Sequence, residues 1–115
     1  MVVDEVERET LDDVFRALAD GTRRDIVVRT LETEYSVSAL SRLYPMTFAA
    51  VQKHVAVLER AALVSKRRSG REQLVTGNVD TVRRAARLLD QLELVWTARM
   101  DRFGEVLAED PEARS

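Results

Sequence analysis

The chain has 115 residues, of which 33% are charged and 45% are apolar, and its formal net charge is −2. These values are typical of one globular domain with a modest core, predicted over residues 1–115, and they exclude bulk disorder. Cysteine is absent and no apolar run is long enough to cross a membrane, which excludes disulfides, thiolate metal ligands and membrane insertion and is compatible with a cytoplasmic location.

The charges are unevenly distributed along the chain. Residues 1–34 carry 5 basic and 10 acidic side chains, residues 42–87 carry 10 and 3, and residues 88–115 carry 3 and 7. A basic middle between acidic ends is what a phosphate-binding surface needs, although ordinary solvated faces would also account for it. The 16 arginines against 2 lysines suit bidentate phosphate contacts, and codon bias would give the same ratio.

The first third of the chain predicts two helices. Apolar residues at a spacing of three to four predict an amphipathic helix over residues 3–19, which Asp20-Gly21 ends. Thr22 is expected to cap a second helix, which frays near Glu34.

Two more helices follow on either side of a proline. Ser36 or Ser38 starts a short helix that Pro45 ends, because the residue before a proline is forced out of helical dihedral angles. The next helix runs from its expected cap at Thr47 to about Ala61. Its buried stripe is predicted to consist of Val51, Val55 and Leu58.

Residues 63–76 predict a β-hairpin with a basic tip. Leu63-Val64 and Leu74-Val75 are short apolar strands, and Ser69-Gly70 between them is a turn signal. The strand ends that face the turn carry Lys66, Arg67, Arg68 and Arg71. A basic hairpin of this kind can bind DNA backbone or minor groove, whereas a solvated hairpin tip is the structural alternative.

A long helix is predicted over residues 78–109, capped by Asn78. Apolar or aromatic residues recur every seven positions at Val82, Leu89, Trp96 and Phe103, with Ala85, Leu92 and Val106 at companion positions and Arg99 as the one interruption. Such a repeat requires a helical partner. We expect a homodimer formed through the first and last helices, although packing within one chain is the alternative. The dimerisation residues are predicted to be Val6, Val14, Leu89, Leu92, Trp96 and Phe103.

The predicted order α-α-α-α-β-β-α is mainly helical with a small hairpin and resembles a winged helix-turn-helix. The motifs FRALADGTRRDIV, SVSALSRLY, MTFAAVQKHVAVLERAALV and SKRRSGREQLV are similar to those of the ArsR/SmtB family of small dimeric bacterial repressors. The resemblance covers about residues 11–107. It implies that residues 36–61 form the helix-turn-helix and residues 63–76 the wing.

The resemblance also implies which residues contact DNA. The DNA-binding set consists of Thr47, Phe48, Ala49, Gln52, Lys53 and His54 on the recognition helix and Lys66, Arg67, Arg68 and Arg71 on the wing. Gln52 can pair with adenine and Phe48 can pack on a thymine methyl. Thr47 either caps its helix or binds a phosphate. His54, the only histidine, is expected at the rim of the buried stripe.

Four positions depart from the family pattern. Ala62 stands where the family usually has glycine at the end of the recognition helix, so this end must close without a left-handed glycine or the helix must run on. Gln52 replaces a small polar residue, and Phe48 and Ala49 replace polar ones. The base contacts are therefore expected to differ from those of relatives.

Metal sensing, which many members of the family perform, is not expected here. The third helix carries no thiol and the last helix carries no histidine, so soft or imidazole ligands are missing except His54. The chain resembles the metal-independent branch, with no cofactor, and the sequence indicates neither whether a small-molecule effector exists nor what it is. A small apolar ligand near Trp96 and Met100 is one alternative, and core packing explains both residues as well.

The sequence thus predicts a dimeric repressor that binds an inverted repeat in double-stranded DNA. Its own operon is one candidate target. The main alternative is a winged-helix module that binds proteins and does not recognise DNA, for which an uncharged or acidic wing would be typical. An enzyme is not expected, because the chain has no cysteine, one histidine and no glycine-rich phosphate loop.

Overall fold

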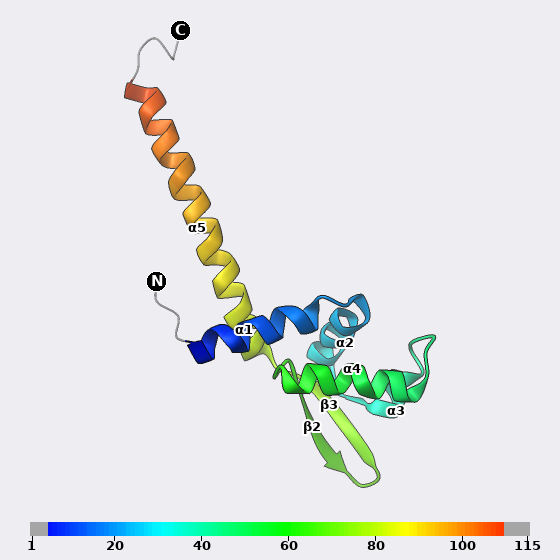
Figure 1. Ribbon diagram of the computed structural model, residues 1–115. Coiled ribbons are helices and arrows are strands. Elements are labelled where there is room, and N and C mark those ends of the chain that lie inside the picture. The colour runs from blue at the N-terminus through cyan, green and yellow to red at the C-terminus, as the bar shows by residue number, and fades with distance from the viewer. Residues whose placement is uncertain (1–4, 110–115) are drawn as a thin grey trace. The chain divides into compact units, whose positions relative to one another are not determined.

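The computed structural model describes residues 5–109 (Figure 1). The expected start of the first helix at residue 3 and the last residues of the domain prediction lie outside this range. The contacts divide the chain into two compact units, with the boundary in the sequence between Ala85 and Ala86. The single domain over residues 1–115 stays a prediction.

The first unit contains four helices, three strands and the start of a fifth helix. In chain order the elements are α1 (Glu5–Leu18), α2 (Gly21–Glu32), β1 (Tyr35–Ser36), α3 (Val37–Ser41), α4 (Phe48–Arg60), β2 (Val64–Ser69), β3 (Glu72–Gly77) and α5 (Val79–Glu109). This order confirms the expected winged helix-turn-helix, with one addition.

The addition is a third strand. The sheet is antiparallel in the order β1-β3-β2, with Tyr35 opposite Val75 in one pair of strands and Val64 opposite Gly77 in the other. The hairpin of β2 and β3, called the wing below, extends from the helices of this unit in Figure 1. The expected hairpin is therefore present as β2 and β3, and β1 extends it to a three-stranded sheet.

The core of the first unit lies between the helices and the base of the sheet. The largest fully buried apolar side chains are Ile26, Leu40, Leu58, Leu63, Val14, Val51, Val55 and Val75. Val51, Val55 and Leu58 form the buried stripe predicted for α4. The two buried polar residues of the described part are satisfied, since the Thr30 hydroxyl donates to Ile26 O at 2.7 Å and the Thr81 hydroxyl to Ala62 O at 2.6 Å.

The helix caps follow the sequence with one exception. Ser36 and Thr47 accept from the backbone N–H three residues later, which starts α3 and α4 as expected. The cap of α2 is Asp20 and not Thr22, because the Asp20 carboxylate accepts the Arg23 N–H at 2.9 Å. The same hydrogen bond lowers the pKa of Asp20. In addition, α3 ends at Ser41, four residues before the proline that was expected to end it.

Helix α4 is followed by an alanine in the left-handed conformation. Ala62 has φ 60°, and among the described residues it is the one non-glycine with positive φ. Its N–H donates to Glu59 O at 3.0 Å, and the next N–H, of Leu63, donates to Leu58 O at 2.9 Å. This is the closure that glycine usually makes, here formed by a residue with a Cβ.

The second unit is the remainder of α5. Leu89, Leu92, Trp96, Phe103 and Val106 are between 54% and 63% exposed, because a single helix has no second layer within its unit to cover them. Arg99, which interrupts the repeat, places its guanidinium 5.9 Å from the centre of the Trp96 ring. No helix in the described range is long and apolar enough to span a membrane.

Candidate nucleic-acid interface

Helix α4 presents one face to the core and the opposite face to solvent. Ala49, Gln52 and Lys53 are exposed, because they lie away from the stripe that packs on the core. The Thr47 hydroxyl accepts the Ala50 N–H at 3.1 Å, so this side chain caps the helix. The exposed face therefore combines a small residue, an amide and a cation.

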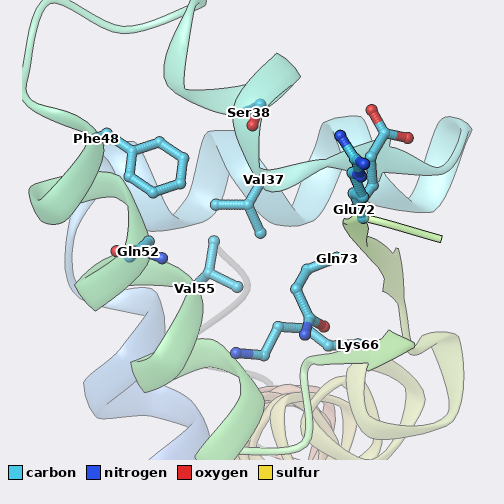
Figure 2. Close-up of a pocket in the computed structure, with 9 residues that line it drawn as sticks. Val37, Ser38, Phe48, Gln52, Val55, Lys66, Glu72 and Gln73 are labelled. Carbon is cyan, nitrogen blue, oxygen red and sulfur yellow. The ribbon is translucent and has the colours of Figure 1, made fainter. Parts of the chain in front are cut away.

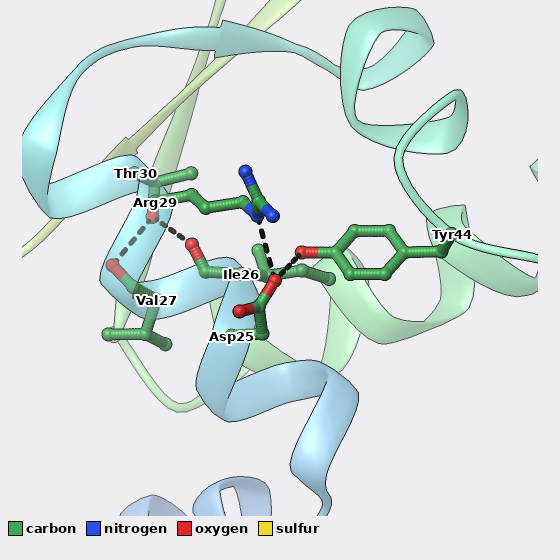
Figure 3. A network of polar contacts seen from close by, with 6 residues as sticks. All are labelled: Asp25, Ile26, Val27, Arg29, Thr30 and Tyr44. Carbon is green, nitrogen blue, oxygen red and sulfur yellow. Dashed lines mark hydrogen bonds and ion pairs between the residues drawn. The ribbon is translucent and has the colours of Figure 1, made fainter.

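A polar network fixes the turn that leads into α4 (Figure 3). Tyr44, in this turn, and Arg29, on α2, both bind the same carboxylate oxygen of Asp25. The hydrogen bond from Tyr44 and the contact with Arg29 lower the pKa of Asp25, while burial and the Asp25 carboxylate raise the pKa of Tyr44 to about 12. The start of the recognition helix is thus tied to α2.

A groove of about 260 Å³ lies between α4, the start of α3 and the wing. Its lining consists of Val37, Ser38, Phe48, Gln52, Val55, Lys66, Arg71, Glu72 and Gln73. Figure 2 shows Phe48 and Gln52 on the side of α4, with Lys66 and Gln73 on the wing. The groove has an apolar floor and a polar rim that carries two cations and one carboxylate. Phe48, which lines this groove, is 46% exposed.

The four basic residues of the wing do not share one face. Side chains alternate along a strand, so Lys66 and Arg68 of β2 lie on the side of α4 and Arg67 lies on the other side. Lys66 Nζ is 3.3 Å from Glu59 Oε1 of α4. Arg67 is bound by Glu34 on the far face, with Nη2 2.8 Å from Oε1.

The tip of the wing is a two-residue turn formed by Gly70 and Arg71, one residue later than the sequence suggested. Gly70 has φ 62°, which a glycine adopts without strain. Arg68 Nε donates to Gly70 O at 3.4 Å. Within the described range no hydrogen bond or ion pair joins Arg71 to another residue, so its guanidinium is available to an anion.

His54 is half-buried and lies near the end of α1 rather than in the groove. Its Nδ1 is 3.4 Å from Arg23 Nη1, and Arg23 Nε donates to Ala17 O at 2.7 Å. Arg24 donates to Leu18 O at 2.9 Å in the same region. These arginines cap the last carbonyls of α1, a role that the sequence analysis missed although two arginines directly after a helix stop would have suggested it.

The residues predicted for dimerisation fall into two groups. Val6 is 74% exposed on α1, and Leu89, Leu92, Trp96 and Phe103 are exposed on α5. Val14 is 1% exposed and packs in the core of the first unit. The expectation that Val14 faces a partner is therefore corrected, because the buried valine offers no surface.

The acidic partners of the wing were also missed by the sequence analysis. Glu34 and Glu59 each bind a wing cation from 33 and 7 residues away in the chain, and no local pattern marks such a distant pair. The described residues contain no group of three or more histidine, cysteine, aspartate or glutamate side chains that would hold a metal ion.

No family model matches the chain. Its relatives in sequence and in structure are transcriptional regulators. The chain is 34% identical over 96 residues to the HTH-type transcriptional regulator Rv2034 of Mycobacterium tuberculosis. The aligned residues cover 84% of this chain and 87% of the relative. An ArsR-like transcriptional regulator from Rhodococcus sp. RHA1 has a similar structure, with a TM-score of 0.76, 27% identity and coverage of 86% of this chain and 93% of that one.

The homodimeric winged helix-turn-helix DNA-binding domain of a possible ArsR-family regulator from Mycobacterium bovis shares the fold. Its TM-score is 0.60 at 24% identity, and the match covers 82% of this chain and 84% of that domain.

Proposed function

The chain belongs to the ArsR family of transcriptional regulators, and on this premise we propose that it is a homodimeric repressor that binds an inverted repeat in double-stranded DNA without a metal effector. The family consists of regulators and not of enzymes, so the chain is not an enzyme. Such a regulator acts in the cytoplasm, where bacterial DNA lies.

The groove between α4 and the wing carries this proposal. A helix fits the major groove of DNA, and a hairpin beside it contacts the neighbouring backbone or minor groove. The DNA strand that separates the two grooves would then pass between α4 and the wing, along the rim that carries Gln52 and Arg71. The basic rim matches the phosphates of that strand in charge.

The proposed roles follow from the position of each side chain. Gln52 pairs with a base, and Phe48 and Ala49 pack on a thymine methyl. Lys53 neutralises a phosphate from the exposed face of α4, while Arg68 and Arg71 bind the backbone from the wing. Thr47, His54, Lys66 and Arg67, which belong to the predicted DNA-binding set, have protein partners and contribute by holding the interface in place.

The proposed dimer uses the exposed apolar residues of α5. Burying a large apolar side chain contributes about 1.5–3 kcal/mol, so covering Leu89, Trp96 and Phe103 favours association of two chains. A domain of the same fold from Mycobacterium bovis is homodimeric, which supports a dimer by analogy but does not identify the helices that form it. Val6 on α1 is proposed to join the same interface, since it is also exposed.

Metal independence is supported by the ligand types present. The chain has no cysteine and one histidine, whose Nδ1 faces the Arg23 guanidinium. A transition metal would need several soft or imidazole ligands at one place. A change in DNA affinity on tight binding of such a metal would contradict this part of the proposal.

Footprinting of the purified protein on the DNA upstream of its own coding sequence tests the proposal. We expect protection of two half-sites about one helical turn apart, as two copies of α4 in successive major grooves would give. Equal affinity for this fragment and for random duplex, or a strictly monomeric protein in sedimentation, would contradict it. Equal affinity would favour the protein-interaction module, although the basic wing is atypical of such a module.

A further inference from the structure

One carboxylate holds both strands of the wing from outside the DNA-binding groove. Glu34 directly precedes β1, and it accepts hydrogen bonds from Arg67 Nε at 3.1 Å and from Arg67 Nη2 at 2.8 Å. Its Oε2 also accepts the Thr76 hydroxyl at 2.9 Å. Because Arg67 lies on β2 and Thr76 on β3, Glu34 joins the sheet edge to the whole hairpin.

This pair is bidentate and only partly covered. The Arg67 side chain is 62% exposed and the Glu34 side chain 34% exposed, so a DNA phosphate at the wing would compete with Glu34 for the same guanidinium. The hydrogen bonds from Arg67, followed by the one from Thr76, lower the pKa of Glu34, so the carboxylate stays charged further into the acidic range than an ordinary glutamate. A phosphate that displaced it would leave this charge facing the DNA without its partner.

The other arginines of the wing are in a different state. Arg71 has no acidic partner among the described residues, and Arg68 contacts only a backbone carbonyl. Both therefore approach a phosphate without first breaking an ion pair. The wing thus contains two available guanidinium groups and one that is already neutralised.

We propose that Glu34 sets the DNA affinity of the wing by withholding Arg67 from the phosphate backbone. This inference rests on the proposed function, because it assumes that the wing lies against DNA. Since phosphate contacts are independent of sequence, the effect applies to cognate and random duplex alike. Glu34 is accordingly a positioning residue that acts through Arg67 and does not touch the nucleic acid.

The test compares Glu34→Gln with Glu32→Gln. The first substitution removes the charge but keeps an oxygen that accepts from Thr76. The second removes the same charge two residues earlier, at an exposed position in the last turn of α2. The affinity of each full-length variant for the upstream fragment and for a scrambled duplex is measured at several salt concentrations. We expect Glu34→Gln to bind both fragments roughly 3- to 10-fold more tightly than Glu32→Gln at low salt, with a salt slope steeper by about one.

Arg67→Gln, made in the native and in the Glu34→Gln background, identifies the group responsible. It should reduce the affinity much more in the Glu34→Gln background, where Arg67 is released to the phosphates, than in the native background, where Glu34 holds it. Thr76→Val, which removes one hydrogen bond to Glu34 and no charge, should produce a smaller gain in the same direction.

Two results would overturn the inference alone. The first is that the native protein binds its operator while Glu34→Gln and Glu32→Gln behave identically. The second is that Arg67→Gln costs the native protein as much affinity as it costs Glu34→Gln, which would mean that Arg67 contacts a phosphate in both backgrounds. Failure of every variant, including the native protein, to bind any duplex would instead contradict the proposed function and the inference together.

Discussion

The Tyr44 hydroxyl donates a 2.5 Å hydrogen bond to Asp25 Oδ2, the same oxygen that Arg29 Nε contacts at 2.8 Å. Tyr44 lies in the turn between α3 and α4, and Asp25 and Arg29 lie one helical turn apart on α2 (Figure 3). The recognition helix begins at Phe48, four residues after Tyr44. Its starting position therefore depends on a phenol that must keep its proton.

Replacing Tyr44 with phenylalanine should destabilise the protein by about 2 kcal/mol at neutral pH, because one hydrogen bond to a charged group is lost. Burial and the nearby Asp25 carboxylate raise the pKa of Tyr44 from 10.0 to about 12 in the folded state. The unfolded chain therefore loses this proton at a lower pH than the folded protein, so the contribution is complete below pH 10 and disappears as the pH rises to about 12.

Urea denaturation of both proteins across this range measures the difference directly. The free energies of unfolding of native protein and Tyr44→Phe should converge between pH 10 and 12. A difference that stays constant through the alkaline range would show that the phenol does not titrate as described.

The helices were predictable because their signals are local. The apolar stripe of α4 and the cap at Thr47 lie within a few residues of each other, and the structure has both. At the start of α2, by contrast, Asp20 and Thr22 are equally good caps two residues apart. The structure selects Asp20, and Arg23 caps the preceding helix from the same turn.

The strand β1 and the division of the wing cations depend on distant contacts. Tyr35 and Ser36 are a strand only because β3 pairs with them from 38 or more residues away in the chain. Likewise, four basic residues near a turn look equivalent in the sequence, whereas strand alternation and the distant Glu34 separate Arg67 from the others. The alternation along β2 could have been inferred from the sequence, whereas the contact of Arg67 with Glu34, 33 residues earlier in the chain, could not.

Replacing Ala62 with glycine should stabilise the protein by about 1 kcal/mol, because an alanine at φ 60° has a steric cost that glycine does not have. Ala61→Gly is the matched control, since this neighbour has φ −83° and is buried, and its substitution should be destabilising. Urea denaturation of the three proteins gives the comparison. A destabilising Ala62→Gly would show that the left-handed conformation carries no strain there.

Gly77→Ala should destabilise the first unit by about 2 kcal/mol. A Cβ at this position would lie 2.8 Å from the backbone nitrogen of Leu31 and 2.8 Å from two of its side-chain carbons, and the backbone atom cannot move aside cheaply. Gly104→Ala provides the contrast, because no described atom lies within 4 Å of its Cβ and alanine stabilises a helix interior by about 1 kcal/mol relative to glycine. Thermal unfolding of both variants checks the pair, and a neutral Gly77→Ala would refute the close packing of β3 on α2.

Gln52→Ala and Arg68→Ala should impair DNA binding in different ways. The amide of Gln52 is proposed to contact one base, so its loss should reduce discrimination at one base pair by about 1–3 kcal/mol and leave random DNA almost unaffected. Arg68 is proposed to bind a phosphate, so its loss should weaken every sequence similarly and reduce the salt slope by about one. Fluorescence anisotropy with the operator, with single-base variants of it and with scrambled duplex, each at several salt concentrations, separates the two effects. Equal losses of affinity on operator and scrambled DNA for both variants would contradict this assignment. Removing a side chain that contacts a base edge should not weaken the binding of all sequences to the same extent.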